Sequence, residues 1–395
     1  MSDRSNIGNI FCFMLLALYS CKKPYTPAVI SSPNSYLVVE GVINQGSDST
    51  VFKINRTVRL GDSSTFNPVL GATVTVEGEQ NGIYNLYDFN NNGHYNSGTG
   101  LSLPTNQRYR LRIKVNNKEY TSDFVEVKLS SPIDSIGYLV QNGNMNLYLN
   151  THDPSNSTRY YRWDYDETWQ FHSKYISSFV LDPATNTIVY RNASQQISYC
   201  FGNDVSSHIV LNSTESLSKD VVFQAQLSVI PLTSEKLETR YSILVRQYAI
   251  TKDAYQFYQV LKKNTEQIGS IFDVLPSELT GNIHCVTQPN EPVIGYVTAT
   301  NVQQKRIYIN HSDLPGDVHP IYPYDCQQQL ALFSDPGTNV NEVQNTLINP
   351  PIDFIPTEAD IKGNPPSLLG YYYSTALCTD CTLRGTVQAP SWWQY

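Results

Sequence analysis

Short stretches of alternating apolar and polar residues dominate the first third of the chain. They lie at 36–43, 50–54, 72–76, 84–87, 109–113 and 124–127, with Gly, Asn or Pro turns between them. A period of two predicts half-buried β-strands, because successive side chains point to opposite faces of a sheet. Strands so closely spaced predict a small immunoglobulin- or transthyretin-like β-sandwich over residues 36–130.

The alternating pattern continues beyond residue 130, with one exception. Further strands are expected at 145–149, 159–165, 221–225 and 241–245. From Ala254 to Leu261 the apolar residues recur at i, i+3, i+4 and i+7, which predicts one α-helix over about residues 252–268. Thr251 is placed to cap its start and Gly269 to end it.

These elements predict a mainly β protein with two sandwich-like domains. The first spans 36–130 and the second spans 131–395, and the single helix packs in the second domain. The Ser-Ser-Pro sequence at 130–132 marks the expected seam. A proline-rich tail follows from Pro350.

An apolar run, Ile10–Leu18, lies near the start of the chain and is too short to span a bilayer. Its length suits the hydrophobic region of a secretory signal peptide, and the sequence 18–21, Leu-Tyr-Ser-Cys, is similar to a bacterial lipobox. We therefore expect residues 1–20 to be removed and Cys21 to be lipidated, with 21–35 as a tether. Plain secretion with an unmodified Cys21 is the alternative.

The amino-acid composition limits the classes of partner that the chain can bind. The formal net charge is −8 and only 16% of the residues are charged, which excludes nucleic-acid binding through a basic surface. Tyrosine is abundant, with 28 residues against 14 Phe, and it suits half-buried strand faces. A surface that stacks sugars or peptides is the alternative, with Trp163 and Trp169 as candidate platforms.

Five cysteines remain beyond the N-terminal segment, and an exported chain is expected to form disulfides. They are Cys200, Cys285, Cys326, Cys378 and Cys381. Cys378 and Cys381 have the spacing of zinc knuckles and of thioredoxin-type sites, but no further ligands and no strand-to-helix context accompany them. We expect a structural bond from Cys326 to Cys378 or Cys381, and a bond from Cys200 to Cys285.

Two clusters of polar residues are candidate sites. Asp88, Asn90 and Asn92 have the spacing of a calcium loop, but no glutamate occupies the twelfth position, and a hairpin turn explains the same residues. Asp164, Asp166 and Glu167 form the second cluster, in which paired carboxylates could serve acid–base hydrolysis; a solvated strand face is the alternative. No nucleotide or nucleophile motif occurs, so we expect no enzyme, cofactor or metal.

Several segments together resemble the Bacteroidetes lipoproteins grouped as domain-of-unknown-function family 4249. They are LVVEGVI, GATVTV, YRLRI, PIDSI, RYSILVRQYAITKDAYQFYQVLKKNTEQIGSIFD, GNIHCVTQPNEPVIGYV and the terminal CTDC with PSWW. The resemblance implies an outer-membrane lipoprotein, and it also implies a link to a TonB-dependent transporter, whose gene often accompanies genes of this family. It implies no activity.

Together, the anchor, the acidic tyrosine-rich composition and the lack of catalytic motifs suggest an accessory protein. We expect it at the outer membrane, held by its lipid, with the cell surface as one of the two faces open to it. There it would dock on a β-barrel TonB-dependent transporter or deliver a ligand to it. A stand-alone surface glycan-binding lipoprotein is the alternative function.

Overall fold

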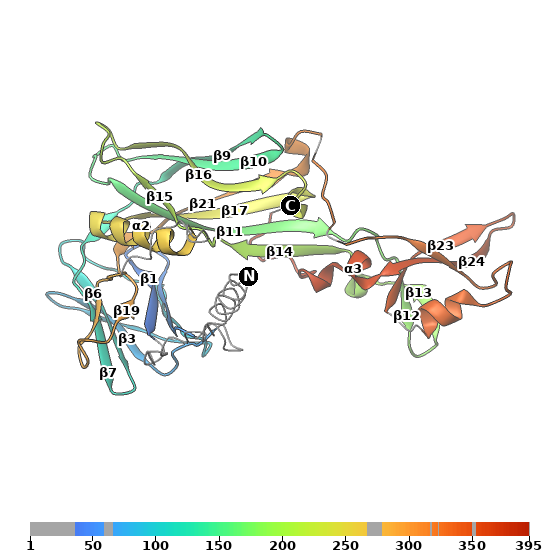
Figure 1. The fold of residues 1–395 in the computed structure, drawn as a ribbon, viewed down its shortest axis with the longest axis horizontal. Helices are drawn as coiled ribbons and strands as arrows, with labels where there is room; N and C mark the ends of the chain where they lie inside the picture. The colour runs from blue at the N-terminus through green and yellow to red at the C-terminus, as the bar shows by residue number, and fades with distance from the viewer. Residues whose placement is uncertain are drawn as a thin grey trace, which may run out of the picture.

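The computed structural model describes residues 36–58, 66–266, 279–316, 318–322, 324–349 and 353–394. The predicted signal peptide, Cys21 and the tether lie outside these residues. The described part is mainly β, as predicted, and consists of an N-terminal domain, a central domain and an arm that extends from the central domain (Figure 1).

The N-terminal domain is a sandwich of two sheets around one apolar core. Val39, Phe52, Ile113 and Tyr120 are among the core residues, and they come from both sheets. One sheet has the order β5-β2-β1-β20-β8, with β19 beside β1, and the other has the order β18-β7-β6-β3-β4. The strands are β1 Leu37–Asn44, β2 Ser49–Arg56, β3 Thr73–Gly78, β4 Ile83–Leu86, β5 His94–Gly100, β6 Tyr109–Val115, β7 Lys118–Ser122, β8 Val127–Leu129, β18 Ile283–Cys285, β19 Val293–Ile294 and β20 Ala299–Asn301.

Three of these strands, β18, β19 and β20, come from the part of the chain that was expected to belong to the second domain. β19 and β20 pair in parallel with β1, and β20 also pairs in parallel with β8. The division into 36–130 and 131–395 therefore needs a correction, because residues 283–301 complete the N-terminal sandwich. The chain consequently passes between the two domains several times.

The predicted seam at 130–132 lies where two of these crossings run side by side. The Ser130 amide donates to Asn301 Oδ1 at 2.5 Å, and the Ala249 amide donates to Ser130 Oγ at 2.6 Å. Gln247, which is fully buried, donates to the carbonyl of Ser131 at 2.7 Å. These short hydrogen bonds connect the two domains at the seam.

The central domain is a second sandwich. Its sheets have the orders β14-β11-β17-β21, with β15 beside β11, and β16-β10-β9, and their facing side chains share one core. The strands are β9 Ile133–Gln141, β10 Asn144–His152, β11 Tyr160–His172, β14 Tyr199–Val205, β15 Val210–Ser213, β16 Val221–Pro231, β17 Arg240–Ala249 and β21 Gln303–Asn310.

The predicted helix is present as α2, Lys252–Glu266, and its expected end at 268 lies outside the described residues. The Thr251 hydroxyl accepts from the Ala254 amide at 3.2 Å, so the predicted capping residue does cap the helix. The apolar face of α2 packs on Tyr160 and Tyr248 of the central sheet and on Val42 of β1. The helix therefore lies where the two domains meet.

The arm consists of the sheet β22-β24-β23 and the hairpin β12-β13, at the right of Figure 1. Its strands are β12 Phe179–Asp182, β13 Thr187–Tyr190, β22 Gln329–Leu332, β23 Phe354–Lys362 and β24 Ser367–Thr375. The remaining helical segments are η1 Ala193–Gln195, η2 Glu235–Leu237, η3 His311–Asp313, the π-helical η4 Gln344–Ile348, α3 Ala376–Thr379 and η5 Cys381–Leu383.

Two disulfides hold the arm and the tail. Cys326 bonds to Cys378, which is one of the two pairings left open by the sequence, and Cys200 of β14 bonds to Cys381. The predicted bond between Cys200 and Cys285 is wrong, because Cys285 is a buried free thiol in the N-terminal sandwich.

Candidate ligand-binding cleft between the domains

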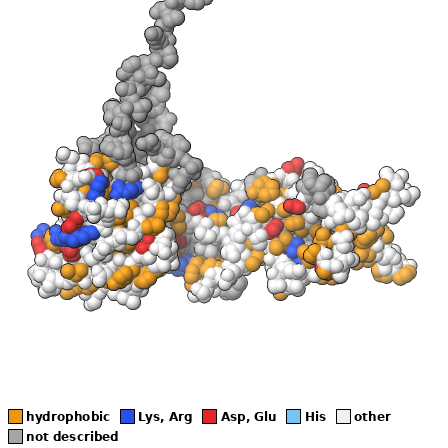
Figure 2. All heavy atoms as spheres, turned by 90° about the horizontal axis from the view of Figure 1, so that it is seen from below, with side chains coloured by type: hydrophobic (Ala, Val, Ile, Leu, Met, Phe, Trp, Pro, Cys, Tyr) orange, Lys and Arg blue, Asp and Glu red, His pale blue; other side chains and the backbone are white. Residues whose placement is uncertain are grey.

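A hollow lies between the N-terminal domain, α2 and the lower face of the central sheet. It has a volume of about 570 Å³, and a second cavity of about 400 Å³ adjoins it. Seen from below, this side shows charged side chains of both signs between the N-terminal domain and the arm (Figure 2). We call the two cavities together the cleft; both are lined by Glu40, Gly41, Lys53, Arg162, Asp164 and Arg246.

The floor of the cleft follows from the alternation along β11 and β17. On β11 the side chains of Arg162, Asp164 and Asp166 point to the face opposite the core. The register places Asp164 directly opposite Arg246 of β17, and Asp166 opposite Leu244. Asp166 is therefore a diagonal neighbour of Arg246. Long side chains reach both direct and diagonal neighbours, so the arginine and both carboxylates meet on the floor.

Arg246 is shared by the two aspartates. Its Nε lies 2.6 Å from Asp164 Oδ1, and its Nη1 and Nη2 lie 2.7 and 2.6 Å from the two Asp166 oxygens. Burial opposes the charge of Arg246, but the hydrogen bonds that it donates to Asp166 and the field of Asp164 raise its pKa above the ordinary value. The planar guanidinium thus holds both carboxylates in fixed positions.

Arg162 forms the inner end of the floor. Its guanidinium lies over the rings of Tyr248 and Tyr258, at 4.3 and 4.9 Å from their centroids, and 3.5 Å from Asp164. Burial alone would lower the pKa of Arg162, but the neighbouring Tyr258 and Asp164 raise it. The stacking connects α2 to the floor, because Tyr258 belongs to the helix.

The three carboxylates proposed for hydrolysis do not form one site. Glu167 points into the core side, where it accepts from Tyr241 Oη at 2.5 Å and from Lys236 Nζ at 2.6 Å. Asp164 and Asp166 lie on the other face and are already bound to Arg246. This geometry provides no free acid and base on opposite sides of a substrate bond, as hydrolysis of a sugar requires.

The two predicted stacking tryptophans are core residues, so that prediction needs a correction. Trp163 is 1% exposed, lies parallel to Tyr161 at 5.6 Å, and donates to Gln247 Oε1 at 2.8 Å. Trp169 is 9% exposed and lies under Lys236. Neither indole presents an open ring face to a ligand.

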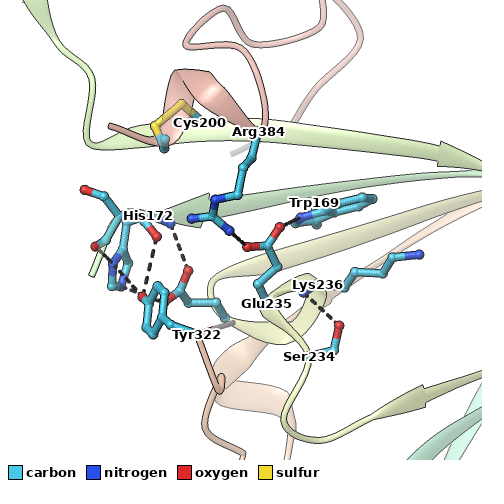
Figure 3. A network of polar contacts seen from close by, with 11 residues as sticks. Trp169, His172, Cys200, Ser234, Glu235, Lys236, Tyr322 and Arg384 are labelled. Atoms are coloured by element: carbon cyan, nitrogen blue, oxygen red, sulfur yellow. Dashed lines mark hydrogen bonds and ion pairs between the residues drawn. A yellow bond between two sulfur atoms is a disulfide. The ribbon is translucent and has the colours of Figure 1, made fainter. Parts of the chain in front are cut away.

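Trp169 belongs instead to a polar network that joins the C-terminal tail to the central domain (Figure 3). Its Nε1 donates to Glu235 of η2 at 3.4 Å, and Glu235 also pairs with Arg384 of the tail. Nearby, Tyr322 donates to Glu238 at 2.6 Å, and burial together with this carboxylate raises the pKa of the tyrosine. We interpret this network as a structural joint.

The calcium candidate is a hairpin turn between β4 and β5. The carboxylate of Asp88 accepts from the amides of Asn92 and Gly93 at 3.1 and 2.8 Å. Gly93 has a φ of +77°, and its Cβ position would lie 2.8 Å from the Ile54 carbonyl, so the turn requires glycine. The part of the chain that the structure describes contains no cluster of His, Cys, Asp or Glu suited to a metal.

Sequence patterns do not single out Arg306 and Trp392, which lie beyond the cleft, on the tail side of the same sheet face. The guanidinium of Arg306 on β21 lies 3.5 Å from the ring centroid of Trp392. Trp392 is 40% exposed, whereas the next residue, Trp393, is 7% exposed and packs against Phe201 and Tyr308. The tail tryptophans therefore cover the far end of the same sheet face.

Comparison with known protein families confirms the resemblance for the quoted segments up to residue 297, whereas the terminal CTDC and PSWW lie outside the matched range. The sequence matches the family described as "Domain of unknown function (DUF4249)" over residues 22–306. The chain belongs to the DUF4249 family. The match covers the N-terminal sandwich and most of the central domain, and it ends before the arm strands β22, β23 and β24.

Other comparisons add little to this family assignment. No curated protein matches the chain. A provisionally named carbohydrate binding protein from Bacteroides uniformis shares 11% identity over 55% of this chain and 90% of its own, with a TM-score of 0.14. The Yersinia pseudotuberculosis adhesin InvE shares 15% identity over 54% of this chain and 55% of its own, also at 0.14. Similarities this weak support no functional argument.

Proposed function

We propose that this DUF4249 protein is a lipid-anchored binding protein of the outer membrane, without catalytic activity. Its ligand occupies the cleft, and the protein delivers that ligand to a TonB-dependent transporter or assists the transporter directly. The observation that carries the proposal is the cleft itself, in which two domains and a helix surround charged groups that are already held in place. Such a concave site with a few fixed polar groups is typical of ligand binding.

Two further features support this proposal. The two disulfides suit a protein that works in an oxidising compartment outside the cytoplasm. The arm extends from the central domain on the side away from the N-terminal domain and α2 (Figure 1). Because these two elements border the cleft, a partner could bind the arm without closing the cleft. No helix among the described residues is long and apolar enough to span a membrane.

The transporter partnership is tested by affinity purification from mildly solubilised membranes. We expect a C-terminally tagged chain to recover a TonB-dependent β-barrel in stoichiometric amounts. A tagged, unrelated outer-membrane lipoprotein serves as the control for nonspecific recovery. If no β-barrel is enriched over that control under several mild detergents, the accessory role is wrong.

We expect Cys21→Ser to release the protein from the membrane without unfolding it. The acyl chains on Cys21 would supply most of the membrane affinity, since each buried methylene contributes about 0.8 kcal/mol. Fractionation should find the variant in the soluble extract, and its circular dichroism should match that of lipase-released wild type. A variant that stays as firmly bound as wild type would argue against the lipobox interpretation.

The stand-alone glycan-binding alternative loses its original candidates, because Trp163 and Trp169 are buried. Any sugar site on this molecule must use other aromatic and polar groups.

A further inference from the structure

The cleft floor continues past the two cavities toward the C-terminal tail. In the register of the central sheet, Asp166 lies opposite Leu244, and Leu244 lies opposite Arg306. These three side chains therefore form one row across β11, β17 and β21. Trp392, stacked on Arg306, borders this row on the tail side.

Arg306 differs from the other arginines of the floor in its partners. Its Nη1 donates to Ser242 Oγ at 3.1 Å, and within the described ranges no carboxylate lies in ion-pair distance of it. Asp166, the acidic residue of the same row, has both oxygens bound to Arg246. Burial lowers the pKa of Arg306, but an arginine in a protein stays charged at neutral pH.

A guanidinium in this state can bind a carboxylate group. Its central carbon lies over the ring of Trp392, and its remaining N–H groups suit the two oxygens of a carboxylate. The partly exposed Trp392 offers an aromatic surface beside that position. We propose that an oligosaccharide that carries a carboxylate lies in the cleft and extends over the adjoining sheet face, with Arg306 as the partner of the carboxylate and Trp392 in contact with the sugar ring.

The rest of the floor favours a sugar over an acidic peptide. An extended peptide is commonly bound by adding a strand to an open sheet edge. Here the ligand faces the flat side of β11, β17 and β21, where backbone groups are already paired between strands. Fixed carboxylates, the guanidinium of Arg246 and the amide of Gln304 instead offer donors and acceptors to hydroxyl groups.

This inference rests on the proposed function, because it assigns a ligand class to the same cleft. It is tested by calorimetric titration of the soluble Cys21→Ser protein with oligogalacturonate, oligomannuronate and hyaluronan oligosaccharides. Methyl-esterified oligogalacturonate and a hexaglutamate peptide are the comparison ligands. We expect at least one uronate probe to bind, and its neutral ester to bind about tenfold or more weakly, as for loss of a charge-assisted hydrogen bond.

Arg306→Met should reduce uronate affinity by about the same factor and leave binding of the ester unchanged. The matched control is Arg240→Met, because Arg240 also stacks on an aromatic ring, Tyr308 at 4.7 Å. It lies at the end of β17, opposite Asn310, and outside the row of Asp166, Leu244 and Arg306. This control should bind the uronate within about twofold of wild type. Circular dichroism checks that both variants are folded, and Trp392→Phe should reduce any fluorescence change caused by the sugar.

Several results would overturn the inference. Equal affinity for the uronate and its ester, or an unaffected Arg306→Met variant, would remove the carboxylate contact. Preferential binding of hexaglutamate would replace the sugar with a peptide. If no uronate probe binds while the transporter is still recovered from membranes, the ligand class is wrong and the proposed function stands; if both fail, both are wrong.

Discussion

A Cys200→Ser/Cys381→Ser variant is expected to lose about 5 kcal/mol of unfolding free energy, and Cys326→Ser/Cys378→Ser about 4 kcal/mol. The two bonds span 181 and 52 residues, and the loop-entropy cost of the unfolded chain rises slowly with that span. The longer bond also joins the tail to β14 of the central sheet, whereas the shorter one lies between the arm and α3.

Urea denaturation and limited proteolysis distinguish the effect of losing the Cys200–Cys381 bond from that of losing the Cys326–Cys378 bond. Loss of Cys200–Cys381 should expose cleavage sites in the tail after residue 375, since that bond joins the tail covalently to β14. Loss of Cys326–Cys378 should give earlier cuts within the arm, at residues 327–375, while the sandwiches stay resistant. Unchanged urea midpoints and cleavage patterns in both double variants would show that apolar packing alone holds the arm and the tail. Double variants are used because a single substitution leaves a reactive thiol.

Local patterns in the sequence were sufficient to locate most regular elements. The alternating segments at 36–43 and 109–113 correspond to β1 and β6, and the i, i+4 spacing after Thr251 corresponds to α2. Each of these elements buries one face against a core, so its period is visible in the sequence itself.

The return of β18, β19 and β20 to the N-terminal sandwich could not be predicted in this way. These strands have only 3, 2 and 3 residues, which is too short for a period to appear. Their pairing is with strands far away in sequence, and no local signal reports such a partner. A boundary drawn at residue 130 therefore captured the first crossing between the domains and missed the later ones.

The cleft was partly visible in the sequence Arg-Trp-Asp-Tyr-Asp-Glu at 162–167. Its alternation already separates Trp163 from Arg162 and Asp164, which indicates a buried aromatic face and a polar face. That signal could have corrected the stacking prediction. The pairing of both aspartates with Arg246 depends on the register between β11 and β17, which a single sequence does not reveal.

Trp163→Ala is expected to lower the free energy of unfolding by about 5 kcal/mol. Removing a fully buried aromatic side chain costs about 3–5 kcal/mol, and the buried Oε1 of Gln247 loses a donor at a further cost of about 1–3 kcal/mol. Gln247 also donates to the carbonyl of Ser131 at the seam between the domains, so its displacement would weaken the contact between the two domains.

Trp163→Phe separates the packing from the hydrogen bond. It keeps a ring against Tyr161 and removes only the indole N–H and part of the volume, so we expect a loss of about 2 kcal/mol. Urea denaturation measures both variants, and uronate titration of the folded Trp163→Phe protein should match wild type, because a core tryptophan contacts no ligand. If Trp163→Phe abolished binding while its stability stayed at the wild-type value, Trp163 would be a ligand platform after all, and the cleft would have to open to expose it.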